Sequence, residues 1–134
     1  MKMGSKINSG LYSGTKGDLR PPHLMDELKN SGFKYTEKDV VMVTKNSENK
    51  LMWLEKGDKY KGLQHFEKHR TELEKHSGEN ITSLPAFVKK VIAGEIFSNG
   101  RNRKGPYTVY RMNNKNYKVA YGDNGFIVSI FPQS

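Results

Sequence analysis

The sequence predicts an α+β fold in which one or two helices pack on a C-terminal antiparallel β-sheet, with a β-hairpin on the N-terminal side. Two observations predict this class. Apolar residues recur at helical spacing in the middle of the chain, between residues 61 and 96. After residue 106, short β-type runs alternate with tight turns, as in antiparallel strands. The 134 residues suffice for one compact domain.

The N-terminal part of the chain differs in composition from the rest. Residues 1–22 are rich in Gly, Ser and Lys, which is typical of a linker or a loosely attached arm. Residues 23–31 fit a short helix, and Gly32 is a natural stop. We therefore divide the chain into an N-terminal arm with a short helix, residues 1–39, and a domain that spans residues 40–134.

The middle of the chain predicts a hairpin followed by two helices. Two apolar runs, residues 40–44 and 51–54, flank a polar turn and indicate the hairpin. A helix is expected over residues 61–76, where apolar side chains recur at helical spacing. A second helix should begin after Ser83, a favourable N-cap residue, with Pro85 in the first turn, where proline is tolerated.

The C-terminal part predicts a meander of three strands. A basic, glycine-flanked loop is expected first, over residues 98–106. The strands should follow at residues 107–112, 116–121 and 126–131. Their connections contain an Asn-Asn pair and an Asn-Gly pair, which favour tight hairpin turns.

The charge is strongly positive, with a formal net charge of +9. Residues 86–134 hold eight lysines and arginines against two acids, a balance of +6. This favours a polyanionic partner: RNA, DNA, an anionic membrane or an acidic protein. The chain has no cysteine, which excludes disulfides, thiol nucleophiles and Cys-rich zinc sites. No run of 18 apolar residues occurs, so we expect no membrane span.

Two histidines, His65 and His69, lie four residues apart in the expected helix and would share one face of it. Two neighbouring imidazoles can divide general-base and general-acid work near neutral pH. The spacing alone favours the simpler interpretation, two surface histidines of which one is held by Glu67 or Glu72. The residues therefore leave both interpretations open.

A zinc site is a third interpretation of the histidine pair. Zinc proteases with histidines at this spacing carry a glutamate directly after the first one. Here Phe66 stands at that position, and His76 is the one open candidate for a third ligand. We therefore expect no metal.

Further candidates for contact with a phosphate or a base lie C-terminal to the histidines. Cations beside glycines can approach a phosphate and stabilise charge in a transition state. Tyrosines interleaved with cations can stack on bases, although aromatic residues in strands more often serve packing. A lone hydroxyl in an apolar strand can donate to a phosphate. The candidates are Arg101, Arg103, Lys104, Tyr107, Arg111, Lys118 and Ser129.

The order of these motifs resembles the barnase–EndoU–colicin–RelE (BECR) class of nuclease toxin domains from bacterial polymorphic toxins, which end contact-dependent inhibition and LXG-type proteins. The resemblance covers residues 40–134 and rests on residues 52–57, on Gly62-Leu63-Gln64-His65 with His69, and on residues 117–119 and 125–132. It implies helices packed on a four-stranded antiparallel sheet. It also implies a metal-independent ribonuclease, often a tRNase, blocked by an immunity protein.

Some functional residues of the class match positions of this chain. The helix histidines match His65 and His69. The hydroxyl, tyrosine and proline that end the EndoU branch match Ser129, Phe131 and Pro132, but Phe131 has no phenol. The phenol and the cation of that branch would then come from other residues: Tyr107, Tyr110 or Tyr121, and Lys104, Arg111 or Lys118.

The expected function is therefore a metal-independent endoribonuclease toxin that needs no cofactor. It would cleave RNA, with tRNA as the expected substrate, to a 2′,3′-cyclic phosphate. It would be delivered as the C-terminal part of a larger secreted toxin and act in the target-cell cytoplasm, as a monomer or as a heterodimer with an acidic immunity protein. The alternatives are a non-catalytic basic module that binds RNA or an acidic protein, and a DNase toxin. An anionic-membrane binder ranks last.

Overall fold

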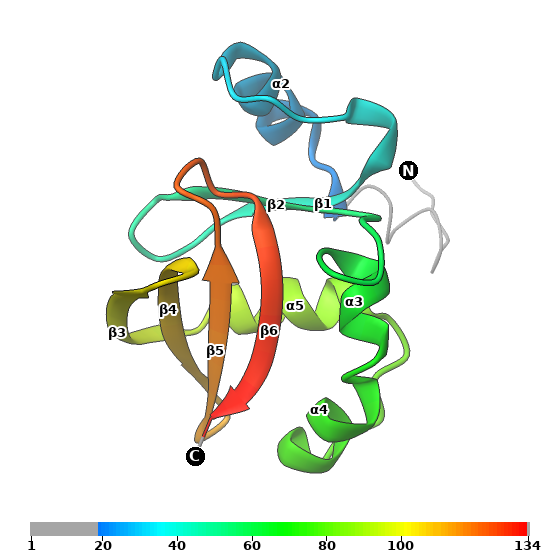
Figure 1. Ribbon diagram of the computed structural model, residues 1–134, viewed down its shortest axis with the longest axis vertical. Coiled ribbons are helices and arrows are strands. Elements are labelled where there is room, and N and C mark those ends of the chain that lie inside the picture. The colour runs from blue at the N-terminus through cyan, green and yellow to red at the C-terminus, as the bar shows by residue number, and fades with distance from the viewer. Residues whose placement is uncertain (1–18, 134) are drawn as a thin grey trace, which may run out of the picture.

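Two antiparallel sheets with a helix between them organise the molecule (Figure 1). The structure, a computed structural model, describes residues 19–133. One sheet is the hairpin β1-β2, and the other has four strands in the order β3-β4-β5-β6. In chain order the elements are α2 (Pro22–Asn30), η2 (Glu37–Asp39), β1 (Val40–Lys45), β2 (Leu51–Glu55), α3 (Leu63–Glu67), α4 (Arg70–Ser77), α5 (Leu84–Ile92), β3 (Glu95–Asn102), β4 (Gly105–Met112), β5 (Lys115–Tyr121) and β6 (Ile127–Gln133).

The expected α+β class, the hairpin and the helix after Ser83 are confirmed. The Ser83 side chain accepts a hydrogen bond from the backbone N–H of Ala86, at 3.3 Å, and so caps α5. Helix α5 packs on β1 and β4, and Figure 1 shows it crossing behind the four-stranded sheet. The tight turns expected between the last strands also form, with Asn113 and Asn114 both at positive φ.

The expected loop over residues 98–106 is wrong, because β3 occupies most of it. β3 pairs with β4 from Glu95 opposite Arg111 to Asn102 opposite Gly105, so the sheet has four strands rather than three. This edge strand buries no side chain. Because no side chain of β3 is buried, the sequence shows no alternation of apolar and polar residues over this strand. Only the turn around Arg103 and Lys104 remains of the loop.

The single helix expected over residues 61–76 is also wrong, since the chain forms two helices, α3 and α4. Between them, the N–H groups of Lys68 and His69 donate to carbonyls three residues back, at 3.2 and 2.8 Å. This tighter turn interrupts the α-helical pattern. Phe66 and Leu73 are still fully buried, one from each helix, so the apolar spacing does not reveal the break.

Helix α2 agrees with the short helix expected over residues 23–31. Its Leu24 and Leu28 are buried in a small cluster with Val40, Val43 and Trp53 of the hairpin. Residues 1–18 of the expected linker lie outside the described residues, and the division at residue 39 stays a prediction. Among residues 19–133, no helix is long and apolar enough to cross a membrane.

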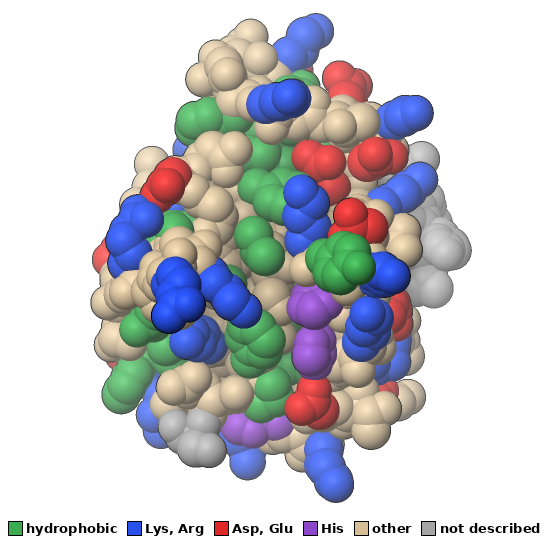
Figure 2. All heavy atoms as spheres, in the orientation of Figure 1, with side chains coloured by type: hydrophobic (Ala, Val, Ile, Leu, Met, Phe, Trp, Pro, Cys, Tyr) green, Lys and Arg blue, Asp and Glu red, His purple; other side chains and the backbone are tan. Residues whose placement is uncertain are grey.

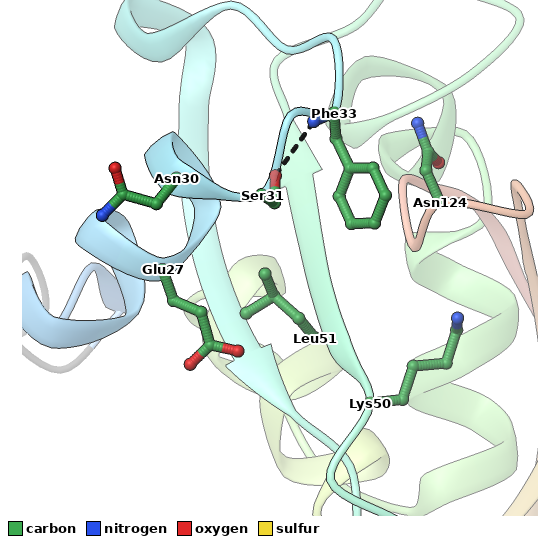
Figure 3. Close-up of a pocket in the computed structure, with 7 residues that line it drawn as sticks. All are labelled: Glu27, Asn30, Ser31, Phe33, Lys50, Leu51 and Asn124. Carbon is green, nitrogen blue, oxygen red and sulfur yellow. Dashed lines mark hydrogen bonds between the residues drawn. The ribbon is translucent and has the colours of Figure 1, made fainter.

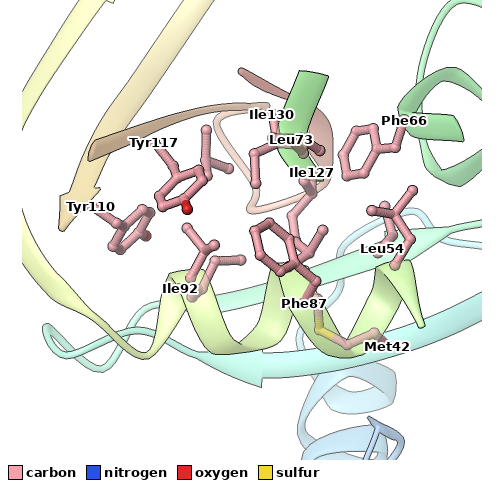
Figure 4. Packing of buried hydrophobic residues seen from close by; sticks show 14 of the residues in the cluster. Met42, Leu54, Phe66, Leu73, Phe87, Ile92, Tyr110, Tyr117, Ile127 and Ile130 are labelled. Atoms are coloured by element: carbon pink, nitrogen blue, oxygen red, sulfur yellow. The ribbon is translucent and has the colours of Figure 1, made fainter. Parts of the chain in front are cut away.

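The main core lies between the four-stranded sheet, α5 and the hairpin, and Figure 4 shows its packing. Tyr110 and Tyr117 are fully buried there. The side-chain amide of Asn46 donates to the Tyr110 hydroxyl at 3.1 Å, which ties the hairpin turn to β4. Burial raises the pKa of Tyr110 to about 12. The backbone N–H of Trp53 also donates to the Gly125 carbonyl, at 3.1 Å, which is a second hydrogen bond between the hairpin and the four-stranded sheet or its turns.

Candidate functional site

The break between α3 and α4 does not separate the two histidines. His65 lies on α3 and His69 directly precedes α4, and their ring centroids are 5.0 Å apart in an edge-to-face arrangement. The His69 ring also meets Phe131 of β6, at 5.8 Å. The structure therefore places the pair beside the last strand of the sheet. Figure 2 shows histidine side chains on this face, next to hydrophobic side chains.

Hydrogen bonds orient both imidazole rings. Nδ1 of His65 lies 3.1 Å from the backbone carbonyl oxygen of Lys59, and Nδ1 of His69 lies 2.7 Å from the Glu72 carboxylate. Because carbonyl and carboxylate oxygens accept hydrogen bonds, each Nδ1 must carry the proton. Nε2 of each histidine is then the nitrogen that can exchange a proton with a ligand.

The loop between β2 and α3 fixes the carbonyl that holds His65. The Asp58 carboxylate accepts from the N–H groups of Tyr60 and Lys61, at 2.8 and 3.2 Å. The hydrogen bond from Tyr60 is the main reason that the pKa of Asp58 is lowered. Gly57 has a φ of +64°, and a Cβ there would lie 2.0 Å from the Lys61 carbonyl oxygen. This position therefore requires glycine.

A cleft of about 520 Å³ adjoins His65. Its floor is the outer face of β5 and β6, where Lys118 pairs with Phe131 and Ala120 pairs with Ser129. One wall comes from the loop before α3 and from α3 itself, and the other comes from the β3–β4 turn. The lining residues are Tyr60, His65, Asn102, Arg103, Lys104, Gly105, Pro106, Tyr107, Lys118, Ala120, Tyr121, Val128, Ser129 and Phe131.

Ser129 is only 4% exposed, and its hydroxyl has no hydrogen-bond partner within residues 19–133. A buried hydroxyl without a partner costs about 1–3 kcal/mol. The side chain lines the cleft, so a ligand bound there can supply the missing partner.

Three cations line the cleft: Arg103 and Lys104 at the β3–β4 turn, and Lys118 on β5. The Lys118 ammonium lies 4.3 Å from the centroid of the Tyr107 ring, a cation–π contact that holds it over the floor. A cleft with this lining attracts anions and can stabilise a phosphate.

Arg101 and Arg111 do not line the cleft. The Arg101 guanidinium pairs with Asp123 at 2.5 Å, and Arg111 donates to the side-chain oxygen of Asn116 at 3.4 Å. The structure thus brings His65 and Ser129 together with Arg103, Lys104, Tyr107 and Lys118, places His69 against His65, and leaves Arg101 and Arg111 outside.

Two features of the site were not expected from the sequence. The first is Tyr60, which lines the cleft with 71% of its surface exposed. The spacing of Gly57 and Gly62 around Asp58 indicates a tight turn and could have drawn attention to it. The second is the Lys59 carbonyl, a backbone group that carries no sequence signal. Of the tyrosines considered as a phenol, Tyr110 is fully buried in the core, whereas Tyr121 lines the cleft.

A second hollow, of about 540 Å³, lies between the end of α2 and the β5–β6 turn (Figure 3). Phe33 projects into it and stacks on Trp53, with ring centroids 6.0 Å apart. Its one carboxylate, Glu27, is paired with Lys45 at 2.9 Å. Its lining includes no histidine, and so it lacks the acid–base pair of the first cleft.

Within the described residues, no group of three or more His, Cys, Asp or Glu side chains is arranged to hold a metal ion. In comparisons with known proteins, no family model matches the chain, and neither does any curated protein.

Proposed function

We propose that this chain is a metal-independent endoribonuclease that cleaves RNA by transphosphorylation. One observation carries the proposal. Two histidines are in ring contact, each with its proton held on Nδ1, and one of them lines a basic cleft whose buried Ser129 hydroxyl has no partner among residues 19–133. An acid, a base and an anion-stabilising group are what this reaction needs, because the RNA supplies its own nucleophile, the 2′-hydroxyl.

In the proposed reaction, Nε2 of one histidine accepts the proton of the ribose 2′-hydroxyl. The 2′-oxygen attacks the adjacent phosphorus while the bond from phosphorus to the 5′-oxygen breaks. The second histidine donates its Nε2 proton to that leaving oxygen. The products are a 2′,3′-cyclic phosphate and a 5′-hydroxyl end, and the two histidines have exchanged one proton through the substrate. Lys118 and the Ser129 hydroxyl stabilise the charge that develops on the phosphate oxygens.

The test is incubation of the purified protein with total bacterial RNA in EDTA, beside His65→Ala and His69→Ala. We expect each variant to lose about 10²–10⁴-fold in cleavage rate, the usual contribution of an acid or base. The matched control is His23→Ala, which removes an exposed histidine on α2. Intact RNA with the wild type, or full activity in both His65→Ala and His69→Ala, would refute the proposal. RNA that is retarded in a gel but keeps its length would indicate a binding module instead.

As part of the same proposal, we base the biological role of the chain on its resemblance to BECR-class toxins. The substrate is then a tRNA, and the chain is the C-terminal part of a larger secreted toxin that acts in the target-cell cytoplasm. An acidic immunity protein would cover the cleft, where three cations attract a negative surface. Loss of discrete tRNA bands in the same incubation supports this role, whereas uniform degradation of all RNA contradicts it.

A further inference from the structure

The exposed tyrosine at the cleft has no structural role that its contacts explain. Tyr60 keeps 71% of its surface exposed, and its ring contact is with the Lys59 ammonium, 5.2 Å from the centroid. The backbone beneath it is fixed, because its N–H donates to the Asp58 carboxylate at 2.8 Å. A large aromatic ring held on a rigid turn and open to solvent is suited to stack on a planar ligand.

The same turn positions the acid–base machinery. The residue directly before Tyr60, Lys59, supplies the carbonyl oxygen that binds Nδ1 of His65. The Lys68 ammonium donates to that oxygen as well, at 3.2 Å, which links the turn to the end of α3. Tyr60 and His65 are therefore tied to the same short turn, and both line the cleft.

Aromatic rings and cations lie together in the rest of the cleft. Tyr107 carries the Lys118 ammonium over its ring, and Tyr121 lines the cleft beside them. Phe131 is 36% exposed at the edge of the histidine pair. Grooves that bind single-stranded nucleic acids combine these two features, since the rings stack on bases and the cations follow the phosphates.

We propose that the cleft takes an unpaired stretch of RNA, with the base next to the cleaved phosphate stacked on Tyr60. This inference rests on the proposed ribonuclease function and names its substrate class. A cleft of about 520 Å³ is of the size that encloses one small ligand such as a nucleotide. A paired helix keeps its bases stacked inside and offers no free base face to Tyr60. Loops and single-stranded ends are the substrates, and duplexes are not.

Binding is measured without cleavage by using RNA with 2′-fluoro groups, which lacks the attacking hydroxyl. Fluorescence anisotropy compares a single-stranded oligonucleotide with the same strand annealed to its complement. We expect the wild type to bind the single strand at least tenfold more tightly. Tyr60→Ala should weaken single-strand binding about tenfold, the usual effect of losing one stacked base, and Tyr60→Phe should preserve it.

The matched control is Phe97→Ala, which removes an aromatic side chain that is 60% exposed and lies on β3 outside the cleft. It should bind both RNAs like the wild type. Equal binding by Tyr60→Ala and wild type, or equal binding of duplex and single strand, would overturn the inference. The two proposals fail separately. Cleavage without a Tyr60 effect leaves the ribonuclease standing, and a Tyr60 effect without cleavage leaves a single-strand binder.

Discussion

The Ser129 hydroxyl carries an energetic cost that no partner within residues 19–133 offsets. Among the described residues it is buried without a partner, as is the hydroxyl of Tyr117 in the core, whereas the buried hydroxyl of Thr108 donates to Asn99 at 2.5 Å. An apolar residue of similar size would fit the position on β6 without that cost. The presence of serine at this costly position supports a hydrogen bond that the hydroxyl makes only when a ligand is bound.

Replacement of Ser129 by alanine should therefore separate stability from activity. We expect Ser129→Ala to match the wild type in free energy of unfolding or to exceed it by about 1 kcal/mol. RNA cleavage should fall about 10²–10³-fold, because a donor to the phosphate is lost. Denaturant titration and a cleavage assay measure the two effects.

Thr108→Val is the control for Ser129→Ala, because it removes a hydroxyl that has partners. It should lower the free energy of unfolding by about 1 kcal/mol or more. A Ser129→Ala protein that loses stability to the same extent, or that cleaves RNA at the wild-type rate, would contradict the assigned role of the hydroxyl.

At the scale of elements, the hairpin and the sheet are joined where Gly125 meets β2. Gly125 has a φ of +108°, and a Cβ there would lie 2.2 Å from the Leu51 carbonyl oxygen. We expect Gly125→Ala to lower the free energy of unfolding by about 3 kcal/mol or more, through backbone strain and this clash. Thermal or denaturant unfolding measures it.

Gly78 offers the matched control for this junction. It also has a positive φ, +75°, but no atom lies within 4 Å of the position of an added Cβ. Gly78→Ala should cost only about 1 kcal/mol, the penalty of the left-handed conformation. Equal losses in the two variants would show that the contact between hairpin and sheet is not tight.

Tyr110 joins the hairpin to β4 and gives this junction a pH dependence. Its pKa in the fold is about 12 against an ordinary value of 10, because burial disfavours the phenolate. The stabilising contribution of the neutral phenol is complete below pH 10 and is lost as the pH rises through 12. Tyr110→Phe has no such group. The unfolding free energy of the wild type should therefore fall by about 2 kcal/mol relative to that of the variant from pH 10 to pH 12, so that the wild type becomes the less stable of the two.

The measurement for Tyr110 is urea unfolding of both proteins across this pH range. Below pH 10 the variant should be less stable by about 1 kcal/mol, since Asn46 loses its acceptor. A constant difference at all pH values would show that the phenol is not protected in the core.

A helix or strand could be predicted from the sequence where burial of one face gives its side chains a periodic pattern. Helix α5 buries Phe87, Val88, Val91 and Ile92 on one face and was predicted from that stripe. Strand β3 buries nothing and was missed, because an edge strand is defined by backbone pairing. The break before α4 was missed because Phe66 and Leu73 remain buried on either side of it.

At the scale of the whole molecule, the fold assembles the site from three distant parts of the chain. The histidines come from α3 and the turn after it, the cations from the β3–β4 turn and β5, and the hydroxyl from β6. Residue types allowed His65, His69 and Ser129 to be proposed from the sequence. Residue types alone could not show that Lys118 lies over the cleft whereas Arg101 pairs with Asp123. That difference depends on the sheet face that each side chain occupies.

The central claim is that the RNA's own 2′-hydroxyl attacks the phosphate with the help of the histidine pair. The most direct test uses a single-stranded RNA that the wild type cleaves at one known site, and the same RNA with one 2′-deoxy residue at that site. In EDTA, we expect a 2′,3′-cyclic phosphate product from the first RNA and no cleavage at the substituted site of the second. With His65→Ala or His69→Ala, cleavage of the first RNA should be at least about a hundredfold slower. Cleavage at the deoxy site, or an unaltered rate in both variants, would contradict the central claim.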